Sequence, residues 1–442
     1  MGKGLSDFEG LNGLFDAEGS FSLPTGQVVL RDCLMMIDGK ENSNGKLVFW
    51  YDRHGDSHFE WSTEENGSPK ILRAFTKQVS KFSVKMHDSR EPIEMLSVQT
   101  TVSHDGTTLK RFTSTRSPII AECSESAASI ELILLNGPEF SNFNRPILLE
   151  TPDIKIKIEE VSGTHEKRKR KSDLRKDSIP TARIEIVTSI PGNLKNSRFT
   201  ETIFQLSDFL TLIRGGACGV GHGLAEDADG KPAFYFLDFT RNDQFHLEQN
   251  WYCRSVSENI QELFSKFLIT SRSDVDGQVF RRAISYYRAA NVTAISNRES
   301  GLITGFAALE LLSTHILKTR GGWTESLLSQ RTSASDKMAA SCALLGLTVD
   351  PFGHAGELTK LAKSNNKLSA FELLAKFRNH LVHQSKEFVF EGIHLRQVWE
   401  LNQWLVELHL LFLLGYYGKM TDRRKLRGWA GETVDVPLSR RD

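Results

Sequence analysis

A short segment near the C-terminal end of the chain carries residue types that suit phosphodiester cleavage. Arg378, Asn379 and His383 lie within six residues in the run Phe377-Arg378-Asn379-His380-Leu381-Val382-His383. The guanidinium of Arg378 can hold phosphate or phosphorane oxygens through a planar fork of donors. The imidazole of His383 can move a proton near neutral pH. The segment therefore predicts cleavage chemistry that needs neither a metal nor a cofactor.

The spacing of these residues leaves two interpretations open. Each residue of a helix turns by about 100°, so Arg378 and His383 differ by roughly 140° around a straight helix axis. They can line one cleft if the helix ends or bends near His383, or if a second helix completes the wall. The alternative is a helix C-terminus at which Arg378, His380 and His383 complement the helix dipole.

Glu310 is a second candidate, because it lies in the apolar run Ala308-Leu309-Glu310-Leu311-Leu312. A carboxylate in such a setting is costly to bury unless it is paired. Arg378 is a plausible partner, which Glu310 would then hold in position. The alternative is a partly exposed helix carboxylate.

Two further segments invite a ligand-binding interpretation. Lys167, Arg168, Lys169, Arg170 and Lys171 form a basic run between two alternating strands, where they predict an exposed hairpin tip. This run suits contact with an RNA backbone, although a solvated loop is the simpler interpretation. The glycine-rich stretch 215–223 does not match a phosphate-binding loop pattern, and an ordinary glycine-rich loop is the favoured interpretation.

The composition is that of an ordinary soluble protein with two or three domains. The chain has 442 residues and equal numbers of acidic and basic side chains, 55 each, which argues against a general nucleic-acid coat. The five cysteines are scattered and never form a CxxC pair, as expected for free thiols in a reducing cytoplasm. The longest apolar run, Leu410 to Leu414, is far too short to cross a bilayer, so no membrane partner is expected.

The first half of the chain has the periodicity of strands. Asp38-Gly39, Asn44-Gly45, Asn66-Gly67, Asp105-Gly106 and Asn136-Gly137 are signals of tight turns. Between and after them lie short strand-like stretches, such as 46–51, 93–100, 154–159, 182–187 and 232–239. Ser207 to Leu212 predicts a short helix. Residues 1–249 are therefore expected to form an antiparallel β-rich sandwich or barrel that acts as a sensor or regulatory domain.

From about residue 250 the hydrophobic period becomes helical. Ile260, Leu263, Phe264, Phe267 and Leu268 fall on one helix face. Residues 280–294, 302–317, 371–382 and 394–417 predict further helices, the last of them unusually apolar. The chain is therefore expected to be an α+β protein, with an all-α bundle over residues 250–442.

The order of the C-terminal elements resembles that of HEPN domains. The resemblance rests on Tyr286-Tyr287-Arg288-Ala289-Ala290, on the run from Gly305 to Leu312, on the run from Phe377 to His383, and on a final apolar helix. It covers roughly residues 250 to 430, and the ApeA-like HEPN family of prokaryotic antiphage defence is the closest subgroup suggested. The β-rich half, near Gly13-Leu14-Phe15 and Phe21-Ser22-Leu23-Pro24, is weakly similar to the N-terminal domain of ApeA-type proteins.

What the resemblance implies is a metal-independent endoribonuclease of antiphage defence, by abortive infection, or of toxin type. His383 would act as general base or acid, Arg378 would stabilise the developing charge, and Asn379 would orient His383 or the phosphate. HEPN domains usually dimerise across one groove, so RNA, a second copy and a phage-derived trigger or regulatory protein are the implied partners. The alternative is a catalytically inactive HEPN protein that binds RNA or serves as an assembly or sensor module.

Overall fold

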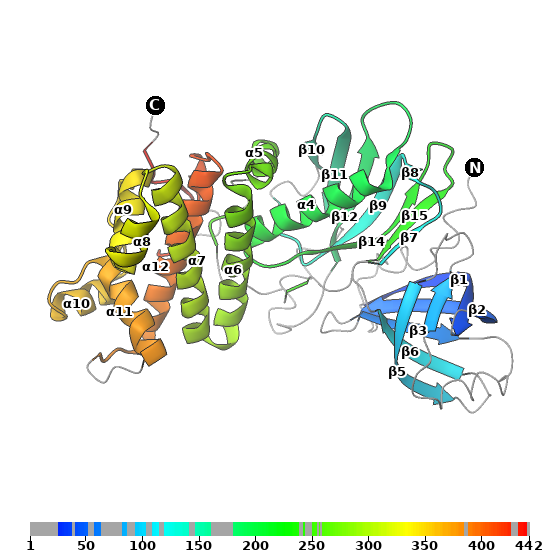
Figure 1. Ribbon diagram of the computed structural model, residues 1–442, viewed down its shortest axis with the longest axis horizontal. Helices are drawn as coiled ribbons and strands as arrows, with labels where there is room; N and C mark the ends of the chain where they lie inside the picture. The colour runs from blue at the N-terminus through cyan, green and yellow to red at the C-terminus, as the bar shows by residue number, and fades with distance from the viewer. Residues whose placement is uncertain are drawn as a thin grey trace. The chain divides into compact units, whose positions relative to one another are not determined.

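The structure is a computed structural model of the whole chain (Figure 1). It describes the backbone of residues 25–37, 40–51, 57–62, 82–85, 93–102, 108–114, 119–140, 146–160, 180–237, 242–243, 250–253, 256, 259–383, 388–425 and 432–439, and most of their side chains from residue 120 onward. The chain divides into two compact units. Unit 1 comprises Met1–Gly137, Asn144–Ser207 and Cys218–His246, and unit 2 comprises Pro138–Phe143, Asp208–Ala217 and Leu247–Asp442.

Six antiparallel strands of unit 1 close into a barrel in the order β1-β2-β3-β6-β5-β4, with β4 paired to β1. Two of the predicted turn signals lie between paired strand ends, because Ile37 pairs with Lys40 and Val102 pairs with Thr108. The predicted turn at Asn44-Gly45 is wrong. Both residues lie inside β2, where Gly45 pairs with Cys33 beside a register shift that a glycine accommodates readily. The barrel strands are β1 (Thr25–Ile37), β2 (Lys40–Tyr51), β3 (Ser57–Ser62), β4 (Phe82–Lys85), β5 (Ile93–Val102) and β6 (Thr108–Ser114).

A seven-stranded antiparallel sheet makes up the rest of the β structure in unit 1, in the order β10-β11-β12-β9-β14-β15-β7. The strands predicted at 154–159, 182–187 and 232–239 correspond to β11, β12 and β15. The sheet strands are β7 (Ile119–Glu122), β9 (Ser129–Leu135), β10 (Ile147–Glu150), β11 (Ile154–Glu160), β12 (Pro180–Thr188), β14 (Gly219–Glu226) and β15 (Pro232–Leu237), and β8 (Ser126–Ala127) pairs separately with β13 (Leu194–Lys195).

One face of this sheet is apolar, as the alternation along its strands predicts. Ile154, Ile156 and Ile158 of β11 are buried, whereas Lys155 between them is exposed. Helix α4 (Asn196–Arg214) packs against the sheet through the ring pair Phe199–Phe234, whose centroids are 6.4 Å apart. The short helix predicted from Ser207 to Leu212 is therefore only the last part of a 19-residue helix.

The glycine-rich stretch after α4 is a helix end followed by a strand. Gly215 adopts a positive φ of 75° directly after α4, which suits a glycine. Gly219 to Gly223 lie in β14, and a side chain at Gly223 would meet the carbonyl oxygen of Glu131 on β9. The loop that the sequence favoured is therefore limited to residues 215–218, and residues 219–223 belong to a strand.

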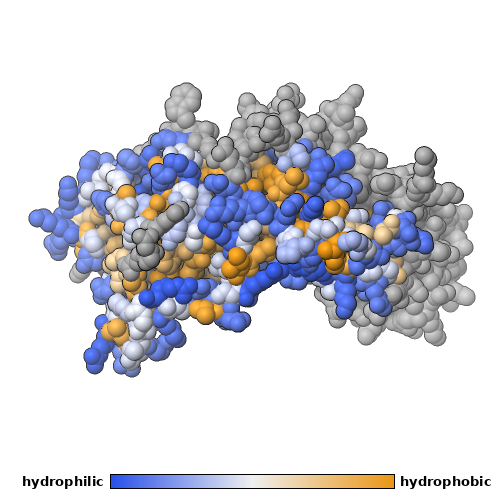
Figure 2. Space-filling model, turned by 90° about the horizontal axis from the view of Figure 1, so that it is seen from above, coloured by the Kyte–Doolittle hydropathy of each residue, from blue (hydrophilic) through white to orange (hydrophobic). Residues whose placement is uncertain are grey.

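Unit 2 is a helical bundle built around α7, which packs against α6, α9, α11 and α12 (Figure 1). The apolar stripe predicted for the first helix is confirmed, since all five of its residues are buried in α5. Among the residues coloured in Figure 2, hydrophilic and hydrophobic side chains are both present at the surface. The helices are α5 (Ile260–Arg272), α6 (Gly277–Ser296), α7 (Arg298–Thr319), α8 (Glu325–Gln330), α9 (Ala334–Leu345), α10 (Gly356–Ser364), α11 (Ala370–His383) and α12 (Gly392–Leu413), and β16 (Lys419–Met420) pairs with β17 (Val434–Asp435).

Two helices form the centre of this bundle. The closing helix α12 ends at Leu413, four residues earlier than predicted, and Gly415 follows it with a positive φ of 62°. Helix α7 approaches α12 closely at Gly305, where a side chain would collide with Asn402 and Gln403. Helix α7 has the length and apolar composition of a membrane-crossing helix, but 56% of that apolar stretch is buried, as in the core helix of a bundle.

Candidate functional site

The predicted catalytic segment lies on α11, which begins with a capping box. The backbone N–H of Ser369 donates to Glu372 at 2.8 Å, and the backbone N–H of Glu372 donates to the Ser369 hydroxyl at 3.2 Å. Hydrogen bonding to Ser369 lowers the pKa of Glu372 and keeps its carboxylate charged. Leu373, Leu374 and Phe377 are buried, whereas Asn379 and His383 are exposed and Arg378 and His380 are half-buried.

Arg378 is half-buried and held by two neighbours. Its Nη1 donates to Oδ1 of Asn379 at 3.1 Å, and its guanidinium carbon lies 5.9 Å from the ring centroid of Phe306 on α7. An arginine over an aromatic face gains a cation–π attraction of about 0.5–1 kcal/mol at such a site. Asn379 therefore orients Arg378 within the chain, whereas the prediction gave it to His383 or the phosphate.

His383 is exposed and is the last residue of α11. Among the described residues no hydrogen bond joins Arg378 to His383, in keeping with their separation of roughly 140° around a straight helix. One chain thus keeps the guanidinium and the imidazole on different sides of α11. Helix α11 also ends at His383. The sequence analysis gave a helix end near this residue as one way in which Arg378 and His383 could line one cleft.

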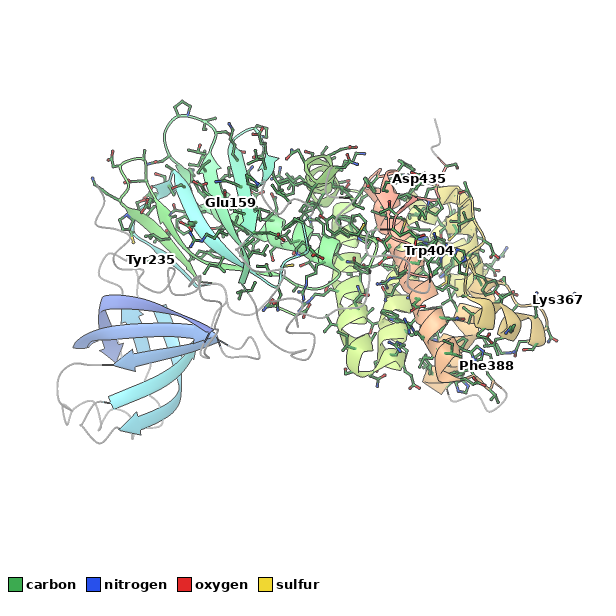
Figure 3. All side chains as sticks on the ribbon, turned by 180° about the vertical axis from the view of Figure 1, so that it is seen from behind. Glu159, Tyr235, Lys367, Phe388, Trp404 and Asp435 are labelled. Atoms are coloured by element: carbon green, nitrogen blue, oxygen red, sulfur yellow. The ribbon has the colours of Figure 1, made fainter. Side chains whose placement is uncertain are left out.

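His380 lies in an aromatic cluster that the sequence analysis missed. Its ring centroid is 5.8 Å from that of Phe388 and 5.3 Å from that of Phe390, and both phenylalanines also pack on Phe377. Its Nδ1 is buried and has no hydrogen-bond partner among the described residues. The signal was the alternating run Phe388-Val389-Phe390, which folds back onto α11 near the label of Phe388 in Figure 3.

Glu310 is not the partner of Arg378. Its carboxylate lies 3.7 Å from Nζ of Lys337 on α9, and 40% of its side chain is exposed. This outcome matches the alternative of a partly exposed helix carboxylate. Glu310 pairs with Lys337 on α9, which packs against α7. Arg378 on α11 instead contacts Phe306, one turn earlier on α7. The basic run Lys167, Arg168, Lys169, Arg170 and Lys171 lies outside the described residues.

A buried polar network around α12 escaped the sequence analysis entirely. Glu407 is fully buried, accepts a hydrogen bond from the Tyr287 hydroxyl at 2.6 Å and lies 3.3 Å from Nε of Arg423. Burial raises the pKa of Glu407 to about 7, against the opposing effects of the Arg423 charge and the Tyr287 hydrogen bond. The guanidinium of Arg423 lies 4.9 Å from the Trp399 ring centroid, so this ion pair is enclosed by the bundle.

A second buried set lies on another side of α12. Nε2 of His409 is 2.9 Å from the Ser341 hydroxyl, and its Nδ1 is 2.7 Å from the Leu405 carbonyl oxygen, to which Nδ1–H donates. Burial lowers the pKa of His409 to about 4, which keeps the imidazole neutral. A serine beside a histidine can suggest nucleophilic catalysis, but both side chains are fully buried and no substrate can reach them.

Comparison with known proteins gives one match. A family described as YopA C-terminal domain matches residues 273–435, which extend from the loop before α6 to β17. No curated protein sequence and no solved structure matches the chain. The helical unit that carries α11 and α12 is therefore similar to the YopA C-terminal domain.

Proposed function

We propose that the helical unit is a HEPN-like ribonuclease domain that cleaves RNA as a pair of chains. The observation that carries the proposal is the state of His383, an exposed imidazole at the end of α11, five residues after an arginine that Asn379 and Phe306 hold in place. Such an imidazole is free to meet a substrate, and the anchored guanidinium has a fixed direction.

The reaction that suits these groups is transfer within the RNA backbone. The 2′-oxygen forms a bond to phosphorus while the bond from phosphorus to the 5′-oxygen breaks, which leaves a 2′,3′-cyclic phosphate and a 5′-hydroxyl. One imidazole takes the proton of the 2′-hydroxyl, and an imidazolium gives a proton to the leaving 5′-oxygen. Arg378 stabilises the charge that builds on the non-bridging oxygens.

Two copies are needed because a single chain supplies one such imidazole, and its own Arg378 lies roughly 140° away around the helix axis. The surface next to His383 suits a second copy. Val382 and Ile393 are exposed, and Val389 is 80% exposed, although all three are apolar. All three lie within ten residues of His383 in the sequence, and apolar side chains open to water gain free energy when an interface buries them. In the pair, His383 of one chain and Arg378 of the other act on the same linkage.

The test is cleavage of single-stranded RNA by the purified full-length chain in EDTA, with mass spectrometry of the product ends. The proposal expects 2′,3′-cyclic phosphate ends and a loss of about 10²–10⁴-fold in rate for His383→Ala. His354→Ala is the matched control, because His354 is also exposed in the helical unit and lies outside α11. Equal rates for His383→Ala and the unaltered chain would refute the chemistry.

A second candidate function has its own supporting observation. The contacts of Arg378 with Asn379 and Phe306 are also those of a structural arginine, as expected for an inactive HEPN-like module that binds RNA or assembles subunits. Binding of RNA that persists in both Arg378→Ala and His383→Ala, without cleavage of any RNA tested, would favour this function. In either case the β-rich unit is proposed as the sensor or regulator.

A further inference from the structure

Lysine side chains divide the helical unit into paired and unpaired regions. Six of its nine described lysines have Nζ between 2.7 and 3.7 Å from a carboxylate oxygen. The three described lysines without such a carboxylate are close together in the sequence, at the end of α10, in the turn after it and on α11. The paired lysines are 266, 318, 337, 360, 419 and 425, and the others are Lys363, Lys367 and Lys376.

Lys376 is fixed in place without being neutralised. Its ammonium donates to Oδ1 of Asn365 at 3.0 Å and lies 5.0 Å from the ring centroid of Phe388. The carboxylate four residues before it, Glu372, is engaged in the capping box at the start of α11. The ammonium therefore has no carboxylate partner among the described residues, and its side chain loses little further freedom on binding an anion.

Lys367 is presented by an unusual turn. Asn366 and Lys367, between α10 and α11, both have positive φ, at 60° and 57°. This conformation is uncommon for a lysine and costs about 1 kcal/mol or more. Lys363 and Lys367 are both exposed, and Figure 3 shows Lys367 at the edge of the helical unit.

Lys376 lies on the same side of α11 as the two histidines of that helix. At 100° per residue, His380 and His383 fall within about 40° of Lys376 around the helix axis, whereas Arg378 falls about 160° away. The same stripe of α11 thus carries a cation and both histidines. A phosphodiester strand that follows the lysines would reach His383 at the end of the helix.

We infer that Lys363, Lys367 and Lys376 form a binding surface for the phosphate backbone of single-stranded RNA. The inference rests on the proposed function for the choice of RNA, and it adds the residues that guide the strand to His383. Three uncompensated cations along one track attract successive phosphates, and their binding releases the counterions of the strand. The paired lysines elsewhere offer no such gain, because each is already neutralised by a carboxylate.

The experiment uses the full-length chain and a short single-stranded RNA whose 2′-hydroxyls are methylated, so that attack by the 2′-oxygen is blocked and binding is measured alone. Fluorescence anisotropy gives the affinity over a series of KCl concentrations. Each phosphate contact in a single strand contributes roughly 0.7 to the slope of log affinity against log salt. Lys363 and Lys367, at the turn from α10 to α11, are called the corner lysines. The double variant Lys363→Gln/Lys367→Gln, called the corner variant, is expected to lower that slope by about 1.4.

The matched control is Lys318→Gln/Lys419→Gln, which removes the same charge from exposed lysines paired with Glu325 and Asp435. Its slope is expected to stay as in the unaltered chain. A single Lys367→Gly variant removes one cation and also relieves the positive φ, so its loss of RNA affinity cannot come from unfolding.

Three results would overturn the inference. They are an unchanged slope in the corner variant, an equal fall in the control, and binding of the corner lysines to phosphatidylserine vesicles in place of RNA. The outcome is separable from that of the nuclease. Loss of RNA affinity in the corner variant, together with no effect of His383→Ala on cleavage, would support the RNA surface and refute the catalytic proposal.

Discussion

Two pairs of arginine and histidine lie in the same helical unit, one pair on α11 and the other on α12 and the segment that follows it, and their surroundings are opposite. Arg378 and His383 on α11 are half-buried and exposed, whereas Arg423 and His409 around α12 are buried. Arg423 lies 3.3 Å from Glu407, and His409 lies 2.9 Å from the Ser341 hydroxyl and 2.7 Å from the Leu405 carbonyl oxygen. The difference teaches that residue type alone does not mark a reactive group, because burial and partners decide whether a substrate can reach it.

The largest expected effect comes from the buried set. Arg423→Met leaves Glu407 without its cation inside the bundle, which is expected to cost about 3–5 kcal/mol of unfolding free energy. Arg378→Met removes a half-buried arginine and is expected to cost roughly 1 kcal/mol of unfolding free energy or less. Thermal unfolding of the two variants at neutral pH measures the contrast. Similar midpoints for both would show that the Glu407–Arg423 pair does not hold the bundle together.

The next effect is a pH dependence in which two buried groups oppose each other. The folded-state pKa of Glu407, about 7, lies above the ordinary 4.5, so its contribution to stability falls as the pH rises from about 4.5 to 7. The folded-state pKa of His409, about 4, lies below the ordinary 6.5, so its contribution is lost as the pH falls from about 6.5 to 4. Each effect amounts to about 3 kcal/mol, and they nearly cancel between pH 4.5 and 6.5.

Single substitutions separate the two contributions. In Glu407→Gln only the effect of His409 remains, so the melting temperature is expected to rise from pH 4 to 6.5. In His409→Gln only the effect of Glu407 remains, so the melting temperature is expected to fall from pH 4.5 to 7. The measurement is the melting temperature across this pH range, with His383→Gln as the exposed control. Parallel pH profiles for all the variants would show that neither buried group titrates as its surroundings require.

The smallest effect is expected at Glu310. Its pair with Lys337 is partly exposed, so a double-mutant cycle of Glu310→Gln and Lys337→Met is expected to give a coupling of about 0.2–1 kcal/mol. A cycle between Glu310→Gln and Arg378→Met is expected to give none, because the two side chains have other partners. A coupling larger for Arg378 than for Lys337 would restore the partnership that the sequence suggested.

Much of the fold could be predicted because local periodicity records which face of an element is buried. The alternation of Ile154, Ile156 and Ile158 predicted β11, and the spacing of Ile260, Leu263 and Phe264 predicted α5. Local signals were misleading where tertiary contacts prevailed. Asn44-Gly45 has the composition of a turn but lies in a barrel strand, because pairing of β1 with β2 absorbs it at a register shift.

The candidate site was predictable only in part. The helix that carries Arg378 and His383 followed from its apolar stripe, but the partners of its polar residues come from distant segments. Phe306 on α7 and Phe388 after α11 fix the surroundings of Arg378 and His380. The run Phe388-Val389-Phe390 is visible in the sequence, but its packing on His380 and the contact of Phe306 with Arg378 are set by the tertiary fold. The ion pair of Glu407 likewise joins residues from α12 and the segment that follows it, with Tyr287 from α6.

Hydrophobic patterns along the chain are enough to predict that antiparallel strands precede a helical bundle, and that a guanidinium and an imidazole stand five residues apart at the end of one helix. Which charged groups are neutralised and which stay open to solvent depends on the packed fold. The physical reason is that hydrophobic periodicity is local, whereas the partner of a charge is set by elements that meet only when the chain is packed. Lys376 and Lys337 show the difference, since both lie on helices of the same bundle and only Lys337 has a carboxylate opposite it.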